Sequence, residues 1–127
     1  MARLVLGKTP KFFKPFTVKF ELPEGGEDKL LVTCKYRTRS EFAEFLQELY
    51  AESGEKQPEG EKVDFVELFK KGGEKTVAHM TKFLESWDLA ESITPTNLAA
   101  LHNQVPAAAS AITAAYSRAC TEGALGN

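Results

Sequence analysis

The 127-residue sequence has few residues of the kinds that usually carry chemistry. Two histidines and two cysteines are present, and neither pair has a neighbour at the spacing typical of metal ligands or of a nucleophile and its base. Glycine and lysine do not occur in the order of a phosphate-binding loop. The sequence therefore indicates a protein that is not an enzyme, with no catalytic residues, metal site or cofactor, and with His79 and His102 at the surface or its boundary.

Long apolar segments are missing too. No stretch approaches the roughly 18 consecutive apolar residues that cross a membrane, so we expect no membrane association. Cys34 and Cys120 lie far apart, which favours two free thiols in a reducing, cytoplasmic compartment, with a single disulfide between them as the alternative. Hydrophobic residues make up 43% of the chain, enough for one core, and residues 1–127 are predicted to form a single domain.

Two alternating segments in the first third predict a β-hairpin. In FTVKFEL (16–22) and KLLVTCKYR (29–37), apolar side chains recur at every second position, the period of a half-buried strand. The segment between them contains Gly25 and Gly26, which suit a tight turn. The opening RLVL (3–6) is a candidate third strand. We assign residues 1–38 to this hairpin region.

Residues 39–127 form the predicted helical region. Thr38 and Glu41 have the spacing of a capping box before a helix that ends near Ser53, and a flexible loop is expected at about 53–62. A second helix is expected to open at Asp64 and to stop at Gly72-Gly73. A third carries Val77, Met80, Leu84 and Trp87 on one seam, and two more begin at Pro95 and Pro106. The fold class is α+β and predominantly helical, with the hairpin packed against about five helices.

Charge is unevenly distributed along the chain. Residues 1–39 hold nine Lys/Arg against four Asp/Glu, whereas residues 41–61 hold seven Glu against one Lys. We favour mutual neutralisation of neighbouring elements, and the alternative is a bipolar surface for head-to-tail self-association. The net charge of −2 and the lack of an arginine-rich pattern argue against nucleic-acid binding.

The last third carries the most specific pattern. WDL (87–89), NLAAL (97–101), Pro106 and AITAAY (111–116) follow one another in an order that resembles the closing pattern of tail assembly chaperones from long-tailed, non-contractile, lambda-like phages. The hairpin followed by SEFAEFLQEL (40–49) is similar in order to the first half of that family.

This resemblance implies a protein that binds the tape measure protein and promotes polymerisation of the tail tube around it. The implied partners are the tape measure protein, the tail tube protein and further copies of the chain in a homo-oligomer. A longer form made by ribosomal frameshifting is a further partner, because Leu125-Gly126-Asn127 is compatible with a slippery codon sequence. The implied location is the host cytoplasm during assembly, with the protein absent from the mature virion.

Five apolar residues are the predicted partner-binding or self-association surface: Trp87, Leu98, Leu101, Ile112 and Tyr116. The alternative for all five is ordinary core packing. Two other functions stay open on the sequence, a structural tail component such as a tube or connector subunit and a small bacterial adaptor or regulatory domain. A tube subunit needs more strands than one hairpin supplies.

Overall fold

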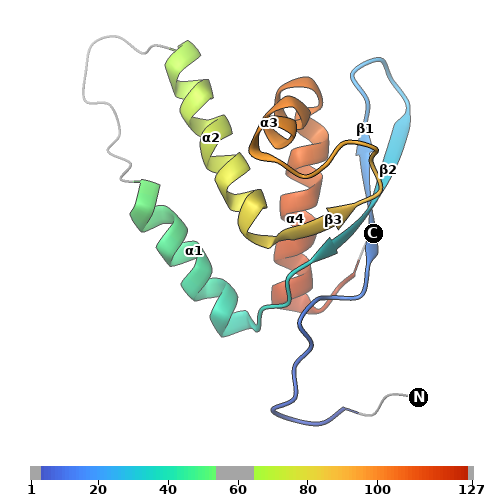
Figure 1. The fold of residues 1–127 in the computed structure, drawn as a ribbon, viewed down its shortest axis with the longest axis vertical. Coiled ribbons are helices and arrows are strands. Elements are labelled where there is room, and N and C mark those ends of the chain that lie inside the picture. Colours follow the sequence, from blue (N-terminus) through green and yellow to red (C-terminus); the bar gives the residue numbers. More distant parts are fainter. Residues whose placement is uncertain (1–3, 54–64, 126–127) are drawn as a thin grey trace.

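The computed structural model describes residues 4–53 and 65–125 and has an α+β architecture, as predicted (Figure 1). The described residues form four helices, one fewer than expected, and a three-stranded antiparallel sheet. The elements in chain order are β1 (Phe16–Glu21), β2 (Glu27–Cys34), α1 (Arg39–Ser53), α2 (Phe65–Phe83), β3 (Leu84–Trp87), α3 (Pro95–Gln104) and α4 (Pro106–Glu122).

Strands β1 and β2 form the predicted hairpin. They pair antiparallel from Phe16 opposite Val32 to Glu21 opposite Glu27. Gly25 and Gly26 in the turn have φ angles of 94° and 87°, which side chains other than glycine rarely adopt. The alternating apolar residues face the core as expected, and the buried ones are Phe16, Val18, Phe20, Leu30, Val32 and Cys34.

The third strand is β3, not the opening RLVL segment. Strand β3 pairs with the free edge of β2, with Trp87 opposite Val32, so the sheet order is β1-β2-β3. Leu4 and Leu6 lie outside the sheet and are 88% and 89% exposed. The prediction that Trp87 ends a helix is therefore wrong. The chain leaves the helix after Phe83 because an extended segment there satisfies the backbone groups of β2 that the hairpin leaves unpaired.

Helix α1 begins with the predicted capping box. The backbone N–H of Thr38 donates to Oε1 of Glu41 over 2.9 Å, and the N–H of Glu41 donates to Oγ1 of Thr38 over 3.2 Å. Phe42, Phe45 and Leu49 form its buried face. The predicted loop at about 53–62 lies outside the described residues apart from Ser53, which belongs to α1, and the predicted N-cap Asp64 also lies outside them.

Helix α2 runs without interruption through Gly72 and Gly73, where the sequence predicted a helix end. Neither glycine has the positive φ of a helix terminus. Packing against the rest of the molecule outweighs the modest helix-breaking tendency of glycine, which is about 1 kcal/mol per residue relative to alanine. Two predicted helices are thus one, and this accounts for the difference in helix count.

Helix α4 packs against β1 and also touches α1 and α3 (Figure 1). Its alanines allow close approach, and Ala108, Ala109 and Ala115 are buried. The Tyr116 ring stacks on Phe83, with the ring centroids 4.1 Å apart and the planes 5° apart. This stacked pair joins the end of α2 to α4 inside the core.

Candidate partner-binding groove

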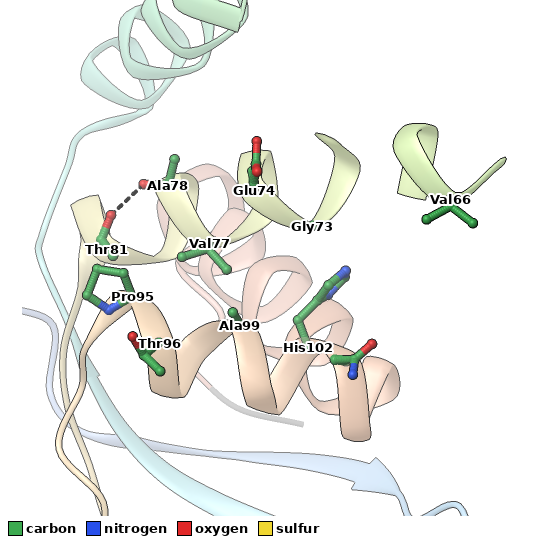
Figure 2. Close-up of a pocket in the computed structure, with 11 residues that line it drawn as sticks. Val66, Gly73, Glu74, Val77, Ala78, Thr81, Pro95, Thr96, Ala99 and His102 are labelled. Atoms are coloured by element: carbon green, nitrogen blue, oxygen red, sulfur yellow. Dashed lines mark hydrogen bonds between the residues drawn. The ribbon is translucent and has the colours of Figure 1, made fainter. Parts of the chain in front are cut away.

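An open groove with a volume of about 1000 Å³ runs between α2 and α3 (Figure 2). We call it the α2–α3 groove. Its lining residues are Val66, Gly73, Glu74, Val77, Ala78 and Thr81 from α2, and Pro95, Thr96, Ala99, His102 and Asn103 from α3. Most of these side chains are apolar or small, so the groove offers an open and mainly apolar surface.

The start of α3 is fixed by side-chain hydrogen bonds. Thr94 is the N-cap, and its Oγ1 accepts a hydrogen bond from the backbone N–H of Asn97 over 3.1 Å. Pro95 follows at the first helical turn, as the sequence predicted. The side-chain amide of Asn97 also donates to the carbonyl of Ser92 over 2.7 Å. These contacts set the position of the α3 wall of the groove.

Gly73 brings the two walls together at one point of the groove. A Cβ atom placed on Gly73 would lie 3.4 Å from Cδ2 and 3.7 Å from Nε2 of His102. Figure 2 shows the His102 side chain rising from α3 toward this part of α2. Gly73 therefore lies where α3 is close to α2, and it does not end a helix.

The interior of the groove is mainly apolar, and its polar groups come from Glu74, Thr81, Thr96, His102 and Asn103. Val77 and Ala99 point into the space between the helices (Figure 2). Thr81 donates its hydroxyl hydrogen to the carbonyl of Ala78 over 2.8 Å, so this hydrogen is already used within α2. Val66 lies farther along α2 and is 81% exposed. An apolar face of a partner helix would find matching side chains along this groove.

A smaller cavity of about 230 Å³ lies next to the groove. Its lining residues are Leu49, Lys75, Thr76, His79, His102, Ser110 and Thr113. His102 lines both spaces. The groove and the cavity therefore share one wall residue.

The five predicted partner-binding residues do not line the α2–α3 groove. Leu98, Ile112 and Tyr116 are completely buried in the core, and Leu101 and Trp87 are half-buried. The indole N–H of Trp87 donates to the carbonyl of Glu91 over 2.6 Å. In this structure Leu98, Ile112 and Tyr116 serve core packing, and partner binding by the five stays a prediction.

Sequence reasoning missed the residues that form the groove. Ala78 and Ala99 carry no signal of their own, because small exposed residues on a helix are common. Gly73 does carry a signal, since a glycine inside a helical pattern often marks close approach, but next to Gly72 it also suits a helix end. The sequence predicts His102 at the surface boundary, and the residue is indeed half-buried.

Burial is the main cause of the pKa shifts of His79 and Cys34. Burial lowers the pKa of His79, and the nearby Arg37 and Lys82 charges lower it further. Burial raises the pKa of the Cys34 thiol to about 12, and the neighbouring Cys120 adds to the shift. Within residues 4–53 and 65–125, no three His, Cys, Asp or Glu side chains gather in a way that could hold a metal ion. None of the described helices is both long and apolar enough to span a bilayer.

Comparison with known proteins identifies the family. The family model of the phage tail assembly chaperones matches residues 1–127, the whole chain. No curated protein and no solved structure matches the chain significantly. The match confirms the resemblance seen in the residues of the last third, and the chain belongs to the phage tail assembly chaperone family.

Proposed function

We propose that this chaperone binds the tape measure protein during tail assembly and holds it until the tail tube polymerises around it. The chain acts by binding, without catalysis. The observation that carries the proposal is the α2–α3 groove, an open apolar surface in a chain whose family assists tail assembly.

The shape of the groove favours an amphipathic helix as the bound segment. Ala78 and Ala99 line the groove from α2 and α3 and are exposed, and their small side chains let a helix backbone come close. Val77 supplies an apolar floor that continues into the core. A helix laid in such a groove buries its apolar stripe, as in other helix-in-groove complexes. Many copies bound along one long client add their individually weak contacts.

The remaining partners follow from the same role. The tail tube protein replaces the chaperone on the client as the tube grows, and copies of the chain associate along the client as a homo-oligomer. A longer frameshifted form would share the described residues and hence the same groove. This work takes place in the host cytoplasm, and the mature virion does not retain the protein.

The helix content favours the chaperone role over that of a tail tube or connector subunit. The described residues form four helices and three short strands, the longest of which is β2. A tube subunit needs a larger sheet than this one.

Co-expression with the tape measure protein encoded in the same phage genome tests the proposal. Wild-type chaperone is expected to keep the tape measure protein soluble and to co-purify with it. Ala99→Glu places a charge in the groove and is expected to abolish the complex, and Ala78→Glu does the same from the other wall. Ala100→Glu is the matched control, because Ala100 is exposed on the same helix but does not line the groove.

Two results would contradict the proposal. One is a tape measure protein that stays equally insoluble with and without the wild-type chaperone. The other is a complex that survives Ala99→Glu as well as it survives Ala100→Glu, with both variants folded by circular dichroism.

A further inference from the structure

Residues 4–10 form an arm at the N-terminal end of the described chain, and we call it the N-terminal arm. Every residue of the arm is exposed. Leu4, Val5 and Leu6 follow one another in it, with exposed fractions of 88%, 54% and 89%. Isolated apolar side chains are common on protein surfaces, but several exposed at one place indicate contact with another polypeptide. The arm therefore has the character of an interaction segment.

The base of the N-terminal arm is fixed to the body of the protein. The backbone N–H of Phe13 donates to the carbonyl of Cys34 over 3.0 Å, and the N–H of Tyr36 donates to the carbonyl of Lys11 over 3.1 Å. The Phe13 ring centroid lies 5.1 Å from that of Tyr36 and 6.2 Å from that of Tyr116. The arm thus leaves the protein at a defined place, beside the end of β2.

The N-terminal arm and the α2–α3 groove lie at opposite ends of the molecule. In Figure 1 the arm, drawn in dark blue, leaves the body at the bottom of the view, and α3 lies near the top. The arm therefore does not lie against the groove of its own chain. A second copy of the chain, however, can bring its arm to this groove.

The groove matches the arm in apolar surface and in charge. Val77 and Ala99 point into the groove, and Val66 at its end is 81% exposed, so the groove also leaves apolar surface in contact with water. Glu74 is the acidic residue of the described lining. The arm carries the opposite charge on Lys8 and contains no Asp or Glu. Neither Lys8 nor Glu74 forms an ion pair within the described part of the chain.

From these observations we infer that the N-terminal arm of one copy binds in the α2–α3 groove of a second copy. Leu4, Val5 and Leu6 cover the apolar surface of the groove, and Lys8 lies near Glu74. Each copy offers its arm to one neighbour and its groove to another, so this head-to-tail association continues beyond a dimer. The inference rests on the proposed function for the groove as a binding surface. It adds that the tape measure protein displaces the arm, because both use one site.

Sedimentation velocity of the full-length chain, without the tape measure protein, tests the head-to-tail contact. The average mass of the wild type is expected to rise with protein concentration. Leu6→Glu places a charge in the apolar part of the arm, and Ala99→Glu places one in the groove. Each variant alone is expected to stay monomeric at concentrations where the wild type associates.

An equimolar mixture of the two variants gives the sharpest result. The Ala99→Glu variant keeps an intact arm, and the Leu6→Glu variant keeps an intact groove, so one of each can join. The mixture is expected to form a 1:1 dimer and no larger species, because the remaining arm and the remaining groove both carry a charge. A symmetric interface, in which both copies use the same patch, does not give this complementation.

Two matched controls test whether any added charge disrupts association. Leu89→Glu changes an exposed leucine that lies outside both the arm and the groove. Ala100→Glu changes an exposed alanine of α3 that does not line the groove. Both variants are expected to associate as the wild type does, and circular dichroism checks that all four variants are folded.

The outcomes separate this inference from the proposed function. A wild type that stays monomeric at every concentration, an association that survives Leu6→Glu or Ala99→Glu, or a mixture of these two variants that stays monomeric would overturn the head-to-tail contact. None of these results bears on the tape measure protein, so the proposed function would stand if co-expression yields the complex. If co-expression fails but the mixture dimerises, the arm contact stands and the proposed client is wrong.

Discussion

Arg37 donates a hydrogen bond from Nη1 to the phenolic oxygen of Tyr116 over 2.7 Å, joining the segment before α1 to α4 across 79 positions of the chain. The guanidinium also lies 4.0 Å from the centroid of the Phe45 ring. Tyr116 in turn donates to the carbonyl of Lys35 over 3.0 Å. This phenol is thus both acceptor and donor at the junction of sheet and helices.

Removal of the Tyr116 hydroxyl should destabilise the protein. Tyr116→Phe leaves the Arg37 donor and the Lys35 carbonyl without this partner, and we expect the free energy of unfolding to fall by about 1–3 kcal/mol. Urea denaturation followed by Trp87 fluorescence measures the loss. Tyr36→Phe is the matched control, since no hydrogen bond of the Tyr36 hydroxyl occurs within the described residues. Equal stabilities of the two variants would contradict this account.

The two glycines within α2 should respond differently to alanine. A Cβ atom added to Gly72 would meet open space, so Gly72→Ala is expected to stabilise the protein by about 0.5–1 kcal/mol. Gly73→Ala should gain less, because its Cβ would lie 3.4 Å from Cδ2 of His102. Thermal and urea unfolding of both variants provide the measurement, and equal gains would mean that α3 does not approach α2 through Gly73.

Acid should weaken the fold through His79. Burial holds the pKa of His79 in the folded protein below 6.5, so the unfolded chain takes up this proton first as the pH falls. The contribution of His79 to stability is complete above pH 6.5 and is lost as the pH falls from there to the lowered pKa, by at most about 1.4 kcal/mol per pH unit. His79→Gln should flatten the curve of unfolding free energy against pH in this window. Parallel curves for the two proteins would refute the assignment.

The two cysteines should be unreactive until the protein unfolds. Cys34 is fully buried, and its pKa of about 12 leaves almost no thiolate at neutral pH. Burial also raises the pKa of Cys120. Both thiols are free in the structure. We expect Ellman's reagent to titrate neither thiol rapidly in the native protein and both in denaturant without reductant, whereas a disulfide would leave none to titrate.

Sequence patterns predicted correctly those helices and strands that are determined by residues close together in the chain. The period-2 alternation of FTVKFEL and KLLVTCKYR is enough to specify the hairpin, because it matches a sheet with one buried face. Thr38 with Glu41 specified the start of α1, and Pro95 and Pro106 specified the starts of α3 and α4. These signals act over a few residues, so the rest of the fold does not override them.

The features that the sequence did not predict depend on contacts between residues that are far apart in the chain. Leu84–Trp87 continues a helical pattern in sequence, and it becomes a strand because the edge of β2 is available to it. Gly73 lies inside α2, at a point where an added Cβ atom would touch His102 of α3. The groove could not be predicted for the same reason: it is the space left between two helices, and its small residues have no periodic signature. The sequence did place Leu98, Ile112 and Tyr116 among the five apolar residues of a predicted partner-binding surface, but a sequence pattern cannot tell a buried face from a docking face.

The pairing of β2 with β3 affects how the nascent chain folds as it leaves the ribosome. The hairpin emerges early, but an isolated hairpin is at best marginally stable in water. The second edge of the hairpin, on β2, cannot pair with β3 until Trp87 has been synthesised. The hydrogen bond from Arg37 to Tyr116 cannot form until later still. A nascent chain stalled before α4 would therefore lack the contacts that consolidate its own sheet. This chaperone gains its final stability only after Tyr116 of α4 has been synthesised.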